Sequence, residues 1–257
     1  MPDPRPAGRV ALVTGAGRGI GRATALLLAA RGERVMGVAR TEQELATLSS
    51  EAPIEVLAES VATQAGCERI VHETRERLGP ISILVNNAGL GSYQERVIWE
   101  QDPEMWRSSL AVNLDAAFHL LRLCTPDMVD AGWGRVVIVS STAGLAGGPA
   151  TAAYTAAKHG VIGLMRSAAQ DLIPHDITCN AVCPGWVRTA MADADAETEA
   201  SATGVTRDEV WEARARSYAA GRVMEPEEIA DVIAYLTSDG ASAVNGEAIT
   251  IALGGHW

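Results

Sequence analysis

The chain has 257 residues, of which 47% are hydrophobic and 21% are charged, and its formal net charge is −11 with histidine neutral. This composition is ordinary for a globular protein and excludes disorder as the main state of the chain. The acidic balance argues against a nucleic-acid-binding protein and against docking on an anionic membrane, because both functions favour a basic surface.

The predicted elements follow from short apolar runs that alternate with longer amphipathic segments. The apolar runs predict strands over Arg9–Thr14, Glu33–Ala39, Ile54–Ala58, Ile81–Asn86, Arg135–Ser140, Ile177–Val182 and Ala248–Ala252. The amphipathic segments predict helices over Ile20–Ala30, Gln64–Leu78, Glu104–Met128, Ala153–Leu172 and Pro226–Leu236. Thr41 and Glu44 have the spacing of a capping box and predict one more helix after them. This alternation predicts an α/β fold with a doubly wound parallel sheet, Rossmann-like, in a single domain over residues 1–257.

Residues 190–221 interrupt this regular alternation. The segment is acidic and rich in alanine, and its predicted helices are short. It could be a solvated insertion, but long excursions from a compact domain are often functional. We therefore expect a lid over a substrate pocket.

The N-terminal segment has no apolar core, so we do not expect a signal peptide. The four cysteines form no CxxC pair, which favours reduced, buried thiols in a cytoplasmic protein. The five histidines lie far apart in the sequence, so no metal site is expected.

A glycine-rich turn follows the first strand. Gly15, Gly19 and Gly21 permit a tight turn and a close approach of the backbone, and the helix that begins near Ile20 directs its free N–H groups toward an anion. A glycine-rich segment alone is weak support, but this one lies between a strand and a helix. The position predicts a dinucleotide-binding turn.

Two arginines indicate which dinucleotide is bound. NAD-selective sites usually place an acidic residue at the end of the second strand, whereas this chain has Arg40 there. Arg18 lies within the glycine turn and could reach the same phosphate. Either arginine alone could be an ordinary surface cation. Because both are present and the acid is missing, NADP(H) is favoured over NAD(H).

A candidate catalytic set lies near the middle of the chain. Tyr154 and Lys158 are one helical turn apart, and a nearby ammonium lowers the pKa of a phenol so that it can transfer a proton near neutral pH. Ser141, at the end of the fifth strand, could hydrogen-bond the same substrate oxygen. Asn113 could hold a water in a proton relay to Lys158. The alternatives are a surface Tyr–Lys pair and a structural asparagine.

Together these motifs resemble the short-chain dehydrogenase/reductase family in its compact, single-domain branch. The motifs are Thr14–Gly21, Asn86–Gly89, Asn113, Ser141, Tyr154 with Lys158, and Pro184 with Gly185. The resemblance spans essentially the whole chain. It implies hydride transfer between a nicotinamide cofactor and a carbonyl or secondary alcohol, in a homotetramer or homodimer.

The resemblance also implies roles for individual residues. The catalytic tetrad would be Asn113, Ser141, Tyr154 and Lys158. Tyr154 would donate a proton to the developing alkoxide, Ser141 would hydrogen-bond that oxygen, and Lys158 would also bind the ribose. Further cofactor contacts would come from Asn87, Gly89, Pro184, Gly185, Val187 and Thr189. Ser60 and Val61 stand where the family usually has an Asp-Val pair near the adenine.

The expected substrate pocket is mostly apolar. Its lining would include Leu145, Gly147, Tyr93 or Gln94, Trp186, and the lid from Met191 onward. This favours a ketone of the 3-oxoacyl type or another mostly apolar ketone. The alternatives are an NAD-dependent secondary alcohol dehydrogenase of the hydroxybutyrate or cyclic-alcohol type, a sugar-nucleotide epimerase or dehydratase, and a non-catalytic cofactor sensor.

Overall fold

The computed structural model describes residues 8–92 and 95–255. Within them, seven parallel strands form one sheet in the order β3-β2-β1-β4-β5-β6-β7. The strands are β1 (Val10–Thr14), β2 (Arg34–Ala39), β3 (Ile54–Ala58), β4 (Ile81–Asn86), β5 (Gly134–Val139), β6 (Ile177–Pro184) and β7 (Ala248–Ile251). The helices are α1 (Gly19–Ala30), α2 (Glu42–Glu51), α3 (Gln64–Leu78), α4 (Pro103–Leu110), α5 (Ala116–Ala131), α6 (Ala152–Leu172), α7 (Ala190–Thr203), α8 (Arg207–Arg216) and α9 (Pro226–Leu236).

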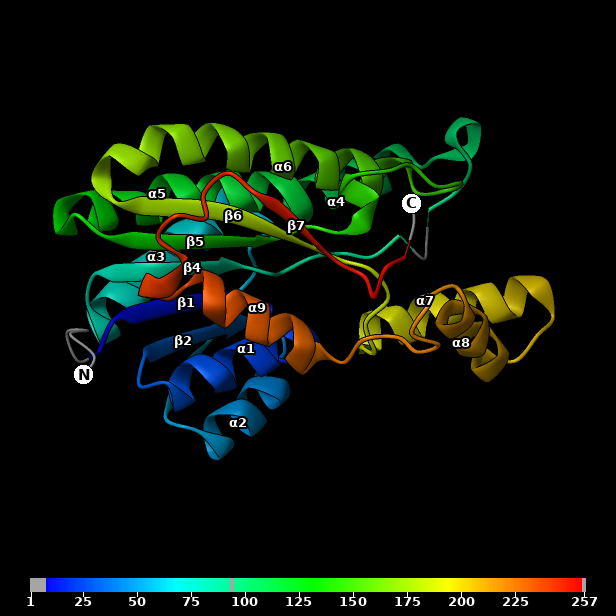
Figure 1. Ribbon diagram of the computed structural model, residues 1–257, viewed down its shortest axis with the longest axis horizontal. Helices are drawn as coiled ribbons and strands as arrows, with labels where there is room; N and C mark the ends of the chain where they lie inside the picture. Colours follow the sequence, from blue (N-terminus) through cyan, green and yellow to red (C-terminus); the bar gives the residue numbers. More distant parts are fainter. Residues whose placement is uncertain (1–7, 93–94, 256–257) are drawn as a thin grey trace.

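Helices cover both faces of the sheet, which confirms the predicted Rossmann-like fold. In Figure 1, α1, α2 and α9 lie on one face, and α3, α5 and α6 lie on the other. The strand order reverses between β1 and β4, so the crevice beyond the carboxyl ends of these strands is where such folds bind ligands.

Two aliphatic cores hold the layers together. Successive side chains of a strand point to opposite faces, so Leu12 joins the core under α3, α5 and α6, whereas Val13 joins the core under α1 and α9. Both side chains are fully buried, as the near-continuous apolar sequence of a central parallel strand requires. The four cysteines are also buried, and none forms a disulfide.

The single long helix predicted over 104–128 is interrupted. A π-helical segment, Ala111–Asp115, lies between α4 and α5. Residue periodicity in the sequence does not reveal this wider turn, because the apolar face continues through it. Asn113 is at the centre of the segment, and π-helical turns often occur at functional sites.

The predicted capping box at the start of α2 is absent, although the helix itself is present. Thr41 is the N-cap residue, but its side chain makes no capping hydrogen bond. The Glu44 carboxylate instead lies 3.6 Å from the guanidinium of Arg18 in the glycine turn.

Residues 190–221 contain two helices, α7 and α8, which stand at the end of the sheet where the strands terminate (Figure 1). The buried guanidinium of Arg214 holds them together. It lies 2.9 Å from Asp195 and 2.8 Å from Glu199 of α7. The same guanidinium stacks 3.5 Å from the ring centroid of Trp186, which follows β6. This cluster joins the two helices to the body of the domain.

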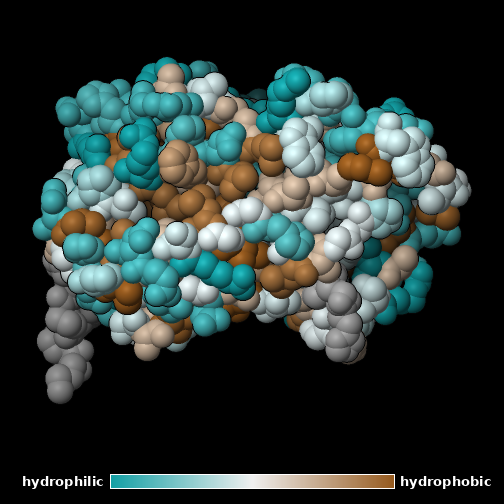
Figure 2. Space-filling view, turned by 90° about the horizontal axis from the view of Figure 1, so that it is seen from above, coloured by the Kyte–Doolittle hydropathy of each residue, from teal (hydrophilic) through white to brown (hydrophobic). Residues whose placement is uncertain are grey.

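The surface over the long helices is partly apolar. Figure 2 shows the molecule from above, where hydrophobic residues gather between polar ones. On α5, the exposed hydrophobic side chains include Phe118 and Val129. Within the part of the chain that the structure describes, no helix is long and apolar enough to cross a membrane.

Candidate active site

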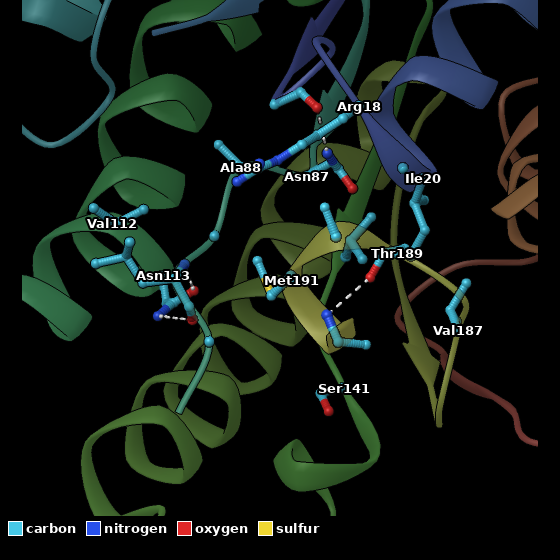
Figure 3. A pocket seen from close by; sticks show the side chains of 18 of the residues that line it. Arg18, Ile20, Asn87, Ala88, Val112, Asn113, Ser141, Val187, Thr189 and Met191 are labelled. Atoms are coloured by element: carbon cyan, nitrogen blue, oxygen red, sulfur yellow. Dashed lines mark hydrogen bonds between the residues drawn. The ribbon is translucent and has the colours of Figure 1, made fainter. Parts of the chain in front are cut away.

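A pocket opens beyond the carboxyl ends of the central strands. It is lined by the glycine turn after β1, the segments after β2, β4, β5 and β6, and the first turns of α6 and α7. Figure 3 shows Arg18 near one end of the pocket and Ser141 near the other, with Asn113 on one side and Thr189 on the opposite side. The pocket is therefore elongated across the point where the strand order reverses.

The glycine turn is built around a close backbone contact. A Cβ atom on Gly21 would lie 2.2 Å from the carbonyl oxygen of Gly15, so only glycine fits at this position. Thr14 connects the glycine turn to the segment that follows β4. Its Oγ1 accepts hydrogen bonds from the backbone N–H groups of Asn87, at 3.1 Å, and Ala88, at 3.0 Å. The Asn87 amide in turn donates to the Thr14 carbonyl oxygen at 2.9 Å.

The structure brings most of the predicted cofactor contacts to this pocket. Its lining includes Gly15, Arg18, Gly19, Ile20, Arg40, Ser60, Val61, Asn87, Gly89, Pro184, Gly185, Val187 and Thr189. Gly21 is not part of this lining. It lies behind it, and its lack of a side chain allows the close contact with the Gly15 carbonyl oxygen.

A dinucleotide fits the residues that are present. The first N–H groups of α1 lie behind the glycine turn, and the N-cap residue Arg18 makes no side-chain capping bond that would occupy them. Arg18 and Arg40 are exposed cations in the lining of the pocket, and the Arg18 guanidinium lies 3.6 Å from the Glu44 carboxylate. These groups suit a pyrophosphate and an additional phosphate.

Lys158 is buried deep in the site. Its side chain is 4% exposed, and its Nζ donates a hydrogen bond to the Val139 carbonyl oxygen at 2.9 Å. Burial lowers the pKa of Lys158 to about 8. The ammonium lies 5.5 Å from the centroid of the Tyr154 ring. Lys158 is therefore still mostly protonated at neutral pH, close to the phenol.

The phenol of Tyr154 behaves differently from the sequence-based prediction. Burial raises the pKa of Tyr154, and a hydrogen bond with the Ser141 side chain opposes this effect. The prediction of a lowered pKa was wrong for this structure, because burial disfavours the charged phenolate most strongly, and Lys158 donates its hydrogen bond to the Val139 carbonyl oxygen. At neutral pH, Tyr154 is a protonated donor beside the Ser141 hydroxyl.

Asn113 reaches the site from the π-helical segment. Its Oδ1 accepts a hydrogen bond from the Leu90 N–H at 3.1 Å, and its Nδ2 donates to the Leu90 carbonyl oxygen at 3.1 Å and to Ser109 Oγ at 3.2 Å. The side chain thus fixes the segment after β4, which is a structural role that the sequence analysis had considered as the alternative.

Only some of the predicted substrate contacts line the pocket. Trp186 and Met191 line the pocket. Leu145 and Gly147 do not line it: both are exposed, because they follow the buried turn Thr142–Gly144, where the chain leaves the pocket. Tyr93 and Gln94 lie outside the described residues.

Two acidic residues near the catalytic helix were missed by the sequence analysis. Asp195 of α7 lines the pocket, and Glu95 contacts the first turn of α6. Both lie in segments without distinctive motifs, so no sequence signal pointed to either. Among residues 8–92 and 95–255, no cluster of His, Cys, Asp and Glu side chains could hold a metal ion.

Comparisons with known proteins agree with this site. Residues 9–200 match the sequence model of a family described as short chain dehydrogenase. A Streptomyces virginiae protein named as a ketoacyl reductase of the monensin polyketide synthase is 39% identical over 252 residues, which is 95% of each chain. A D-beta-hydroxybutyrate dehydrogenase from Cupriavidus necator is 32% identical over 245 residues, covering 93% of this chain and 94% of the relative.

The fold comparison points the same way. A crystal structure of a variant actinorhodin polyketide ketoreductase with NADPH superposes with a TM-score of 0.91 and 35% sequence identity, covering 97% of this chain and 98% of that chain. The ordered motifs, the pocket that joins them and these matches over nearly the full length lead to one conclusion: the chain belongs to the short chain dehydrogenase family.

Proposed function

We propose that this protein is a ketoreductase that uses NADP(H) to reduce neutral, mostly apolar ketones of the 3-oxoacyl type. The observation that carries the proposal is the placement of Tyr154 beside Ser141 and Lys158, at one end of a pocket whose other end suits a dinucleotide. The ketoacyl reductase relative and the NADPH-bound ketoreductase support the same activity.

In the proposed reduction, each residue of the site would have a separate role. The bound nicotinamide cofactor supplies the hydride. Tyr154 donates its proton to the substrate oxygen as negative charge develops there, and Ser141 stabilises that oxygen with a hydrogen bond. Lys158 returns the proton to Tyr154 and contacts the ribose. Asn113 holds the segment after β4 in place and would serve the relay through water.

Tyr154 is in the protonation state that ketone reduction needs. Reduction needs a protonated phenol as the proton donor, and burial raises the pKa of Tyr154, so the donor form predominates near neutral pH.

The charge of the pocket distinguishes the ketoreductase from its alternative, a hydroxybutyrate-type dehydrogenase. A substrate with a free carboxylate needs a nearby cation. Among the described lining residues, the cations are Arg18 and Arg40 at the cofactor end and Lys158, which is buried and donates its hydrogen bond to the Val139 carbonyl oxygen. The lid contributes the carboxylate of Asp195, whose partner is Arg214. A neutral ester or thioester fits this environment better than a free 3-oxo acid.

A comparison of two substrates tests this proposal. With NADPH, we expect kcat/KM for a β-keto ester to exceed that for the corresponding free β-keto acid by at least roughly tenfold, since the acid must bring a second negative charge near Asp195. Steady-state rates of NADPH oxidation measure this ratio. A preference for the free acid would support the hydroxy-acid dehydrogenase instead.

The preference for NADP(H) over NAD(H) rests on Arg40. The Arg40→Ala variant should raise KM for NADPH by about 10- to 100-fold, because a charge-assisted hydrogen bond to a phosphate is lost. KM for NADH should change little. Arg40 is exposed, so its replacement should leave the fold intact. Equal effects of the substitution on both coenzymes would contradict the assignment of Arg40 to the additional phosphate.

The proposal also includes a lid over the pocket and an oligomeric state. Residues 190–221 would act as a lid, since Met191 and Asp195 of α7 form part of the pocket lining. The protein would be a cytoplasmic homotetramer or homodimer, with the apolar surface on α5 contributing to a contact between subunits (Figure 2).

A further inference from the structure

The first turn of the catalytic helix is capped by a residue from a distant segment. One carboxylate oxygen of Glu95 accepts a hydrogen bond from the Ala153 N–H, and the other accepts one from the Tyr154 N–H, both at 2.8 Å. Glu95 follows β4 and lies more than 50 residues before this helix, so the contact is tertiary.

The helix has no local substitute for this cap. Thr151 occupies the N-cap position of α6 without making a side-chain capping bond, because its hydroxyl donates to the Gly148 carbonyl oxygen and lies 2.9 Å from the hydroxyl of Thr155. The first turn of α6 also contains no acidic residue. Glu95 therefore satisfies two backbone donors and places a negative charge at the positive end of the helix.

Glu95 also connects two walls of the pocket. The segment after β4 is held at Ala88 by Thr14 and at Leu90 by Asn113. Glu95 lies further along this segment, and its partners include the backbone N–H of the tyrosine that bears the reacting phenol. The position of the segment and the position of Tyr154 are thus coupled through one carboxylate.

We propose that Glu95 is a positioning residue for the reaction: it fixes the backbone of Tyr154 against the segment after β4 and so sets where the phenol meets the substrate. This inference rests on the proposed ketone reduction. It adds a residue that acts through Tyr154 without touching the reacting atoms.

The charge of Glu95 predicts an effect on the pKa of Tyr154, separate from any effect on the stability of the protein. The ionisable groups near the phenol are the carboxylates of Glu95 and of Asp195 in α7, the ammonium of Lys158 in α6 and the neutral thiol of Cys183 in β6. Burial raises the pKa of Tyr154 most, and the Asp195 and Glu95 carboxylates raise it further. Replacing Glu95 with glutamine removes its charge and leaves one oxygen that can accept a hydrogen bond. The pKa of the phenol should then fall, and ketone reduction should decline from a lower pH.

The test compares Glu95→Ala and Glu95→Gln with Glu100→Gln, a matched substitution at an exposed position of the same connection. With NADPH and a neutral β-keto ester, we expect kcat of Glu95→Ala to fall by roughly 10- to 100-fold, because a displaced phenol reacts poorly. NADPH affinity should stay within about twofold of wild type. Glu95→Gln should lose less activity and should shift the alkaline limb of its pH profile downward, and Glu100→Gln should match wild type.

The outcomes distinguish a failure of the inference about Glu95 from a failure of the proposed function. If wild type reduces the ester and both Glu95 variants keep its kcat and pH profile, even with a lower unfolding temperature, Glu95 is only a structural cap and the inference is overturned. If wild type itself oxidises no NADPH with any ketone, the proposed function fails and the inference fails with it.

Discussion

The Tyr154→Phe variant should lose nearly all turnover while it still binds the coenzyme. The substitution removes the hydroxyl and keeps the ring, so the packing against Lys158 survives. Because general acid catalysis contributes about 10²- to 10⁴-fold to such reactions, kcat for ketone reduction should fall by that range. Stopped-flow or steady-state measurement of NADPH oxidation gives the rate, and fluorescence titration gives the affinity for NADPH.

If Tyr154→Phe lost NADPH affinity as strongly as it lost kcat, the fold of the variant would be disturbed. The Thr155→Val variant is a suitable control, because Thr155 is the next residue on α6 and its hydroxyl bonds to Thr151 rather than to the groups around the phenol. It should retain activity close to wild type. Near-wild-type turnover in Tyr154→Phe would remove the phenol from the reaction.

Gly21→Ala should have the second large effect, on both stability and coenzyme binding. The added methyl group would lie 2.2 Å from the Gly15 carbonyl oxygen and 2.4 Å from the Asn87 side-chain nitrogen, so the turn must move. Overpacking of this kind costs about 1–3 kcal/mol in the free energy of unfolding. The displaced N–H groups of α1 should weaken NADPH binding by at least roughly tenfold.

Denaturant unfolding and fluorescence titration measure the two effects of Gly21→Ala. Gly147→Ala is the matched control, because an added Cβ there meets no atom within 4 Å and Gly147 has no positive φ. It should leave both quantities unchanged. If Gly21→Ala bound NADPH as tightly as wild type, the coenzyme would not depend on the close contact of Gly21 with the turn.

Much of the fold could be predicted because its signals are local. The apolar runs of buried parallel strands, such as the sequence around Leu12 and Val13, differ clearly from the amphipathic helices between them. The close packing at Gly21 is also local, since the turn and the helix are adjacent in the chain. Tyr154 and Lys158 lie one turn apart on the same helix, so their proximity needed no tertiary information.

The features that escaped prediction depend on contacts between distant segments. Glu44 lies near Arg18 of the glycine turn, and the capping box predicted at the start of α2 does not form. The environment of the phenol depends on burial, which single-sequence patterns do not give, and so the predicted direction of the Tyr154 pKa shift was wrong. Glu95 and Arg214 act on partners far away in the sequence, and no spacing rule connects them.

The most direct test of the whole account follows the hydride itself. NADPH with both hydrogens at C4 replaced by deuterium is incubated with the protein and a neutral β-keto ester, and the alcohol product is analysed by NMR. The account predicts one deuterium at the carbinol carbon for each NADPH oxidised, and at least roughly 100-fold less labelled alcohol when Tyr154→Phe replaces the wild type under the same conditions and time. An alcohol without deuterium at that carbon, or NADPH binding with no oxidation across a range of ketones, would contradict it.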